Sequence, residues 1–387
     1  MTPPRGRAAV AVCVAGVLAV PAACSSEQSP PATSPPTPAS SSPSPTTRTT
    51  PTEPGAPRSA EPAPGPVTIA VAGDVHFEGV LEARLDDPPT ALAPATARLA
   101  AADVAVVNLE TSIGTGGRPE PGKRYAFQAP PSALTALAAA GIDVATMANN
   151  HALDFGRAAL PGTFAALDAA AAARPPLAVV GIGRDADEAF RPARSDVDGT
   201  VVATLGATVA DADPTADPTG HWAATEDRGG TADAMDPARL LRAVREADRS
   251  ADVVVVYLHW GVQGERCPTQ AQRSLAADLV AQGGDVVVGS HAHRLQGDGR
   301  LRDGYVAYGL GNYAWYTQAS EATSVTGVLT LTVRPAATRR GRATVTDARW
   351  DPARIGADGL PRPLRGPAAA RFATERAALR ACAGLAR

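Results

Sequence analysis

The chemistry that this sequence offers is concentrated in its histidines. The chain has six among 387 residues, and five of them follow short apolar runs that are typical of β-strands. These five are His76, His151, His259, His291 and His293. Imidazole nitrogens and carboxylate oxygens are the ligands that borderline divalent metals prefer, so gathering them would create a metal site. The sixth, His221, lies in a polar loop and is expected to be solvated.

Carboxylates and amides accompany these histidines at a spacing of two residues. Residues two apart on an extended chain point the same way, so Asp74 should project with His76, and His291 with His293. The candidate metal donors are Asp74, His76, Glu110, Asn150, His259, His291 and His293. They outnumber the ligands of one ion, whereas two divalent ions that share a bridging carboxylate would use them all and could activate a water molecule.

Each of these residues also has a simpler explanation. An Asp-x-His sequence is common by chance, and Asn149 and Asn150 before His151 would suit a helix cap. The joint placement of five histidines after apolar runs favours the metal site.

The elements that must position these residues are read from the apolar runs. Strands are predicted over 67–73, 103–110, 142–150, 252–260 and 285–293, and helices over 91–102, 130–141 and 268–284. Strands alternate with helices up to about residue 290, which predicts an α/β fold with many parallel pairs. The runs are continuous rather than alternating, so the strands should be buried on both faces. The carboxyl ends of parallel strands share one edge of a sheet, where sites are built.

The N-terminal region predicts export. Arg5 and Arg7 precede an apolar run that ends in small residues at Cys24, so residues 1–24 are interpreted as a signal peptide. Small residues before Cys24 also occur in lipoprotein signals, so a lipid anchor at Cys24 and simple cleavage with release both stay open. Residues 25–66 are rich in Pro, Ser and Thr and are expected to be a disordered linker. The mature chain should then lie outside the cytoplasm, in the cell envelope or secreted.

The remaining chain is interpreted as one domain over 67–350 and a C-terminal tail over 351–387 packed on it. Cys267 and Cys382 are the cysteines of this part, and in an exported protein they favour one disulfide. Two unpaired buried thiols are the alternative. The net charge is −3 without a basic run, which gives no reason to expect a nucleic-acid partner.

Six motifs together resemble a known family. "VAGDVHFEG", "VVNLETSI", "MANNHALDFG", "LHWGVQ", "GSHAHRLQG" and "YGLGNY" occur in the order and spacing of CapA-type proteins of poly-γ-glutamate capsule synthesis. These proteins are similar in fold to calcineurin-like metallophosphoesterases, and the resemblance covers about residues 67–333. It implies a four-layer α/β/β/α sandwich with mixed sheets and a metal site at the C-terminal edge of the strands.

The resemblance also implies roles for individual residues. One ion would be held by Asp74, His76 and His293, and the other by Asn150, His259 and His291. Glu110 would bridge the two ions, which would be manganese, iron or zinc. His151 would be the catalytic residue outside the metal shell, either as the acid or as a stabiliser of charge on the substrate. The supporting residues would be Asn108, Asn149, Asp154 and Asn312.

Three functions follow as hypotheses. The first is an exported metal-dependent hydrolase or transferase that acts on a cell-surface polymer or its precursor, with membrane-embedded polymer synthase subunits as candidate partners. The second is a non-catalytic component of polymer export or anchoring, and the third is a general secreted phosphoesterase. On each of them the chain would contact a membrane only through an N-terminal lipid anchor.

Overall fold

The computed structural model describes residues 64–387 except 210–216, 218, 318–319 and 339–340. The signal peptide and lipidation site expected within residues 1–24, and nearly all of the expected linker, lie outside the described residues. Among the described residues, no helix combines the length and apolarity needed to cross a membrane.

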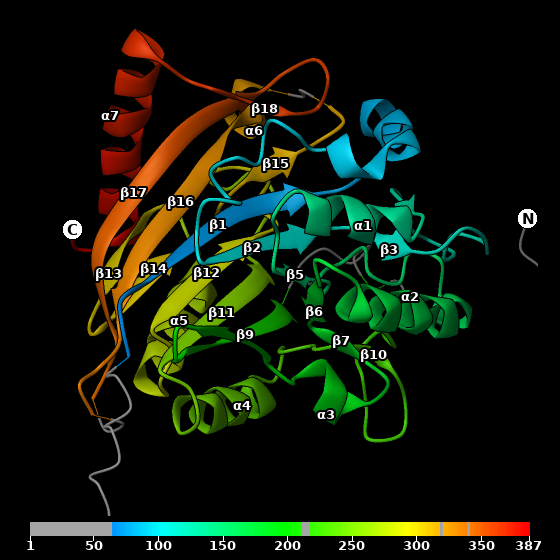
Figure 1. The fold of residues 1–387 in the computed structure, drawn as a ribbon, viewed down its shortest axis with the longest axis horizontal. Helices are drawn as coiled ribbons and strands as arrows, with labels where there is room; N and C mark the ends of the chain where they lie inside the picture. The colour runs from blue at the N-terminus through cyan, green and yellow to red at the C-terminus, as the bar shows by residue number, and fades with distance from the viewer. Residues whose placement is uncertain (1–63, 210–216, 218, 318–319, 339–340) are drawn as a thin grey trace, which may run out of the picture. The chain divides into compact units, whose positions relative to one another are not determined.

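The first sheet is mixed, with parallel strands on one side and antiparallel strands on the other (Figure 1). Its strand order is β18 (Pro361–Pro363), β17 (Thr344–Ile355), β16 (Val325–Arg334), β1 (Val67–Val75), β2 (Val104–Leu109), β5 (Val144–Thr146) and β6 (Ala178–Val180), with β15 (Asn312–Ala314) also paired to β1. The strands from β1 to β6 run parallel, as the alternation of strands and helices predicts.

The second sheet has a parallel centre between antiparallel edges. Its order is β13 (Asp298–Leu301), β14 (Gly304–Ala307), β12 (Val286–Ser290), β11 (Val253–Trp260), β9 (Thr200–Val209) and β8 (Ala193–Val197). Short pairs beside the sheets are β3 (Ser112–Ile113) with β4 (Gln128–Ala129), and β7 (Ile182–Gly183) with β10 (Gly230–Thr231).

Helices complete the layers on the outer faces of the two sheets (Figure 1). The α-helices are α1 (Ser132–Ala139), α2 (Leu160–Ala172), α3 (Ala186–Ala189), α4 (Ala238–Asp248), α5 (Gln270–Ala281), α6 (Glu321–Ser324) and α7 (Gly366–Ala383), and the 3-10 helices are η1 (Gly79–Asp86), η2 (Pro88–Thr90) and η3 (Arg157–Ala159).

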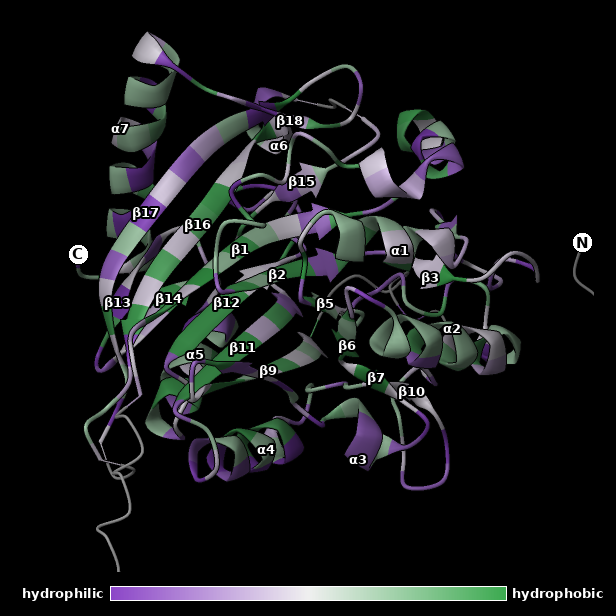
Figure 2. Cartoon of the chain, viewed as in Figure 1, coloured by the Kyte–Doolittle hydropathy of each residue, from purple (hydrophilic) through white to green (hydrophobic). Residues whose placement is uncertain are grey.

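The buried apolar side chains fall between these layers. One core joins the first sheet to α1 and α2, a second lies between the two sheets, and a third joins the second sheet to α4 and α5. All eight residues of β11 are buried, which matches the continuous apolar run over 252–260. The four-layer α/β/β/α sandwich with mixed sheets is therefore confirmed. Figure 2 shows apolar colour along the inner strands and hydrophilic colour at the arrowhead ends of β1 and β2.

Two sequence expectations about the elements are wrong. Residues 91–100 form successive turns rather than a helix, because Pro94 has no amide hydrogen to donate to a helical ladder. The boundary expected at residue 350 falls inside β17, so the last residues continue the first sheet before they form α7. All described residues belong to one compact unit.

Helix α7 is attached to the rest of the domain by apolar, ionic and covalent contacts. Phe372, Leu379 and Ala383 form its buried face, and Arg376 forms an ion pair with the buried Asp298 of β13. A disulfide joins Cys382 of α7 to Cys267, with their Cα atoms 5.8 Å apart.

Candidate metal centre

The strand register brings polar side chains together at one edge of the first sheet. Asp74 of β1 lies opposite Asn108 of β2 and opposite Asn312 of β15. This close approach requires glycine, because a Cβ at residue 73 would lie 1.7 Å from the carbonyl oxygen of Gly311. The strand ends therefore converge as the sequence predicts, and the absence of a side chain at Gly73 makes this close approach possible.

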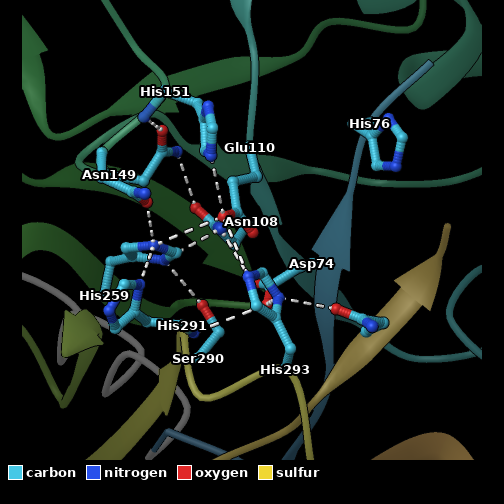
Figure 3. Close-up of polar contacts among 12 residues, drawn as sticks. Asp74, His76, Asn108, Glu110, Asn149, His151, His259, Ser290, His291 and His293 are labelled. Carbon is cyan, nitrogen blue, oxygen red and sulfur yellow. Dashed lines mark hydrogen bonds and ion pairs between the residues drawn. The ribbon is translucent and has the colours of Figure 1, made fainter. Parts of the chain in front are cut away.

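Glu110 lies at the middle of this group, directly after β2 (Figure 3). Its side chain is fully buried, and neither carboxylate oxygen has a hydrogen-bond partner among the described residues. Its Oε1 lies 3.6 Å from His259 Nε2, 3.8 Å from His151 Nε2 and 3.9 Å from His293 Nε2. Burial, followed by the nearby Asp74 charge, raises the pKa of Glu110 well above its usual value. An isolated carboxylate among imidazoles needs a cation to stabilise it.

His259 forms one side of the group together with two other candidate metal ligands, Asn150 and His291. Its Nε2 lies 2.7 Å from Asn150 Oδ1 and 3.1 Å from His291 Nδ1. Its Nδ1 contacts Ser290 Oγ at 3.1 Å, and residues 259 and 290 are register partners in β11 and β12. Burial, then the neighbouring histidines, lowers the pKa of His259 well below its usual value, so the ring is neutral, as a metal ligand must be.

Asp74 and His293 form the other side. Asp74 Oδ2 lies 3.4 Å from His293 Nδ1, and Asn108 donates a hydrogen bond to Asp74 Oδ1 at 2.9 Å. Asn312 Oδ1 also contacts His293 Nδ1, at 2.8 Å. Burial raises the pKa of Asp74, but hydrogen bonding and the charge of His293 outweigh it and lower the pKa overall. Asp74 is thus held in its ionised form.

His291 and His293 reach the group by a route that the sequence did not predict. We expected them to project together from an extended strand, but β12 ends at Ser290. Their φ angles are 92° and 54°, which lie in the left-handed region that residues other than glycine rarely adopt. Such strain persists only where surrounding contacts enforce it, and it is frequent at functional sites.

The structure does not bring His76 to this group, and the expectation that it projects with Asp74 is wrong. The register of β1 against β15 shifts between Asp74 and Val75, so the two-residue rule does not hold there. The His76 ring instead lies among Phe127, Trp315 and Tyr316, with ring centroids 4.1–5.0 Å away. Figure 3 shows it to one side, without a drawn contact to the other labelled residues.

His151 faces Glu110 from the loop that follows β5. Its Nδ1 lies 2.6 Å from Asp154 Oδ2, and its ring stacks on Phe127 with a centroid distance of 4.1 Å. Burial lowers the pKa of His151 although the Asp154 carboxylate opposes the shift. Asn149 Oδ1 accepts a hydrogen bond from the His151 amide, but residues 150–155 form turns and the next helix begins at Arg157, so the helix-cap alternative is wrong. His221, by contrast, is exposed.

These residues fit a metal. Ligand atoms of Asp74, Glu110 and His259 lie within 4.8 Å of one another. The unpaired Glu110 carboxylate and the neutral His259 supply the charge and the lone pairs that a divalent ion requires. We use the term candidate metal centre for the set that the structure brings together, which is Asp74, Glu110, Asn150, His259, His291 and His293.

Several neighbours of the centre were missed from the sequence. Lys123 contacts Asp154 and Asn150, Phe127 stacks on His151, and Trp315 packs against His293 with the two rings tilted. Aromatic residues leave no spacing signal when they lie in loops. Lys123 could have been noticed from composition, because it is the only lysine in the sequence.

The fold and site define an α/β sandwich protein with a buried cluster able to hold a metal. The family model "Bacterial capsule synthesis protein PGA_cap" matches residues 68–316, which is more than half of the chain. The chain belongs to this family, and the resemblance to CapA-type proteins is confirmed.

Curated relatives agree with this assignment. The chain is 32% identical over 197 residues to the capsule biosynthesis protein CapA of Bacillus anthracis, covering 50% of this chain and 45% of that protein. It is also 32% identical over 174 residues to the PGA biosynthesis protein CapA of Bacillus subtilis strain 168, covering 44% and 42%. The matched region thus spans less than half the length of these two relatives.

A solved structure was also compared. A crystal structure described as a novel phosphatase, from Mycoplasma pneumoniae, aligns with 74% of this chain and 93% of its own, at 13% identity and a TM-score of 0.43.

Proposed function

We propose that this chain is an exported, CapA-like protein of capsule, poly-γ-glutamate or other cell-surface polymer synthesis, with a metal-dependent hydrolase or transferase centre. Family membership supports the process, since relatives are named for capsule and PGA biosynthesis. The reaction is argued from the site, because a fold alone does not specify chemistry.

The observation that carries the proposal is the Glu110 carboxylate. It is buried without a hydrogen-bond partner among the described residues, and imidazole nitrogens of three histidines surround one of its oxygens. A protein without a ligand for this carboxylate would be more stable with glutamine or an apolar residue there. The arrangement is therefore best explained by binding of divalent metal.

The chain's own residues have distinct roles in this proposal. Two divalent ions would be held by Asp74 and His293 on one side and by Asn150, His259 and His291 on the other, with Glu110 between them. When bound, the metal lowers the pKa of water and stabilises negative charge on the substrate. In its doubly protonated form, which the Asp154 carboxylate favours against burial, His151 would pass the proton on Nε2, the nitrogen that faces Glu110, to the leaving oxygen or nitrogen, while Asp154 accepts the Nδ1 proton and fixes the orientation of the ring.

The location and partners belong to the same proposal. The N-terminal signal and linker would place the domain outside the cytoplasm, by lipid attachment at Cys24 or by release. There it would meet the polymer or its precursor, and membrane-embedded synthase subunits.

The test is elemental analysis of the purified chain, beside variants of the centre and of His151. We expect about two metal equivalents, as in two-metal sites, with loss in His259→Ala and Asp74→Asn. His151→Ala should keep its metal and lose any activity. Equal metal loss in all three variants would contradict the role of His151.

Two further outcomes would change the function. If the chain binds no metal after addition of manganese, iron or zinc, the hydrolase proposal fails and the non-catalytic export component is favoured. If the metal-loaded chain hydrolyses simple phosphoesters and leaves γ-glutamyl polymer intact, the general phosphoesterase is favoured.

A further inference from the structure

Lys123 stands out by composition before its position is considered. It is the only lysine among the 36 lysine and arginine residues of the chain. Every other permanently cationic side chain is therefore a guanidinium. A single exception suggests a position where arginine does not serve.

The Lys123 side chain is 3% exposed and lies beside the candidate metal centre. Its Nζ lies 2.9 Å from Asp154 Oδ1 and donates a hydrogen bond to the carbonyl oxygen of Asn150. The same nitrogen lies 5.0 Å from the centre of the Trp222 ring, within the range of a cation–π contact. Partners from two other segments thus converge on one atom of the 114–127 loop.

This convergence explains why lysine is needed. An ammonium is a compact point charge whose three N–H groups can point to partners in different directions. A guanidinium is planar and wider, and its donors form a fixed fork. The carboxylate, the carbonyl and the ring that surround Lys123 suit the ammonium.

Two polar partners of Lys123, Asp154 and Asn150, each connect it to the candidate metal centre. Asp154 uses its other oxygen to hold His151 Nδ1 at 2.6 Å and to accept the Phe127 amide at 2.7 Å. Asn150 places its side-chain oxygen 2.7 Å from His259 Nε2. The Lys123 ammonium therefore restrains Asn150, which belongs to the centre, and Asp154, which orients the ring of His151.

We propose that Lys123 is a positioning residue that sets Asn150 and His151 against the candidate metal centre from one point. It acts through these residues and contacts neither substrate nor metal. This inference rests on the proposed metal centre, but part of it concerns the metal-free protein and can be tested there.

The experiment compares Lys123→Met and Lys123→Arg with the parent chain and with Arg124→Met. Arg124 is the adjacent, exposed cation and stacks on Tyr125, so its variant controls for loss of charge in the same loop. Manganese and zinc affinities are measured by calorimetry. The state of the His151 ring is measured in the metal-free protein by ¹⁵N NMR, with assignment by His151→Gln.

We expect Lys123→Met to weaken metal binding by about 10-fold to 100-fold, as loss of groups that orient ligands does. The His151 Nδ1–H signal of the parent should disappear or broaden, because Asp154 is no longer restrained. Lys123→Arg should show the same NMR change and weaker binding, although charge is retained. Arg124→Met should match the parent in both measurements.

The results that overturn the inference are distinct from failure of the proposed function. Parent-like metal affinity and a parent-like His151 signal in Lys123→Met, or full rescue by Lys123→Arg, would refute the positioning role. If the parent binds no metal, the proposed centre fails, and the His151 signal alone decides the inference. If Lys123→Met does not fold, Lys123→Arg decides, together with acetylation of the single lysine, which should be much slower in folded than in unfolded parent chain.

Discussion

Two buried carboxylates at different places in the molecule have opposite surroundings. Asp298 of β13 is bound by Arg376 through Nε at 2.7 Å and Nη2 at 2.5 Å, and by the hydroxyl of Tyr305. Glu110 is equally buried but has no hydrogen-bond partner among the described residues. Burial raises the pKa of both, yet Arg376 reverses the shift for Asp298, while the pKa of Glu110 stays well above its usual value.

The difference shows which carboxylate is structural. A buried charge is tolerated when it is paired and hydrogen-bonded, and Asp298 meets both conditions while attaching α7 to the sheet. Glu110 has no hydrogen-bond partner among the described residues, and the imidazole nitrogens of His259, His151 and His293 lie 3.6–3.9 Å from its Oε1. It therefore lowers the stability of the metal-free protein, and a bound cation would reverse that effect.

The largest effect on stability is expected at the end of the chain where α7 is attached. Replacing both Cys267 and Cys382 with serine should lower the free energy of unfolding by about 4 kcal/mol, because the bridge closes a loop of 115 residues. Urea denaturation measures this, and reduction of the parent chain should reproduce it. Metal content should not change. A fall in metal content would show that the attachment of α7 and the candidate metal centre depend on each other.

Removal of the paired carboxylate should have the next largest effect. Asp298→Asn should cost about 3 kcal/mol, since it leaves Arg376 partly buried without its counter-charge. Because the pKa of Asp298 is lowered on folding, its contribution is present above the ordinary value of 3.8 and is lost as pH falls through the folded value. Urea denaturation between pH 3 and pH 7 checks both statements. Asp303→Asn, in the exposed turn after β13, is the control and should change little.

Replacement of Glu110 should change the free energy of unfolding in the opposite direction, toward higher stability. Glu110→Gln should stabilise the metal-free protein by about 2 kcal/mol at neutral pH, because a buried carboxyl without a hydrogen-bond partner among the described residues costs free energy there whether it ionises or takes up a proton. The folded-state pKa is raised, so the parent loses stability as pH rises from the ordinary value of 4.5 through the folded value, and the difference between variant and parent should grow over that range. Thermal melts with a chelator present measure this. A destabilised variant would show that Glu110 has a structural partner.

The smallest effect is expected at His76. His76→Ala should leave metal affinity within about twofold, since its ring lies outside the candidate metal centre, whereas loss of a true ligand costs far more. Calorimetric titration with zinc beside His259→Ala makes this comparison. A loss equal to that of His259→Ala would return His76 to the ligand set that the family resemblance implies.

Much of the fold was predictable because local signals and tertiary environment agree. Continuous apolar runs predicted buried parallel strands, and β11 is buried throughout. The prediction failed where a single residue overrides a pattern, as Pro94 does over 91–102. Helix α7 was missed because it is rich in alanine and its two large apolar side chains, Phe372 and Leu379, leave no clear apolar stripe, so contacts with other segments, β13 and β17 among them, define its buried side.

The candidate site was predictable in composition and only in part in geometry. Ligand chemistry depends on residue type, so the sequence by itself determined that histidines, carboxylates and amides would gather after the strands. Which of them meet depends on register and on backbone angles that no spacing rule contains. The shift after Asp74 turned His76 away, and the left-handed backbone at His291 and His293 turned both rings inward. The tertiary structure alone decided that Glu110 has no hydrogen-bond partner among the described residues and that the single lysine contacts Asp154 and Asn150, because pairing inside a protein depends on segments far apart in sequence.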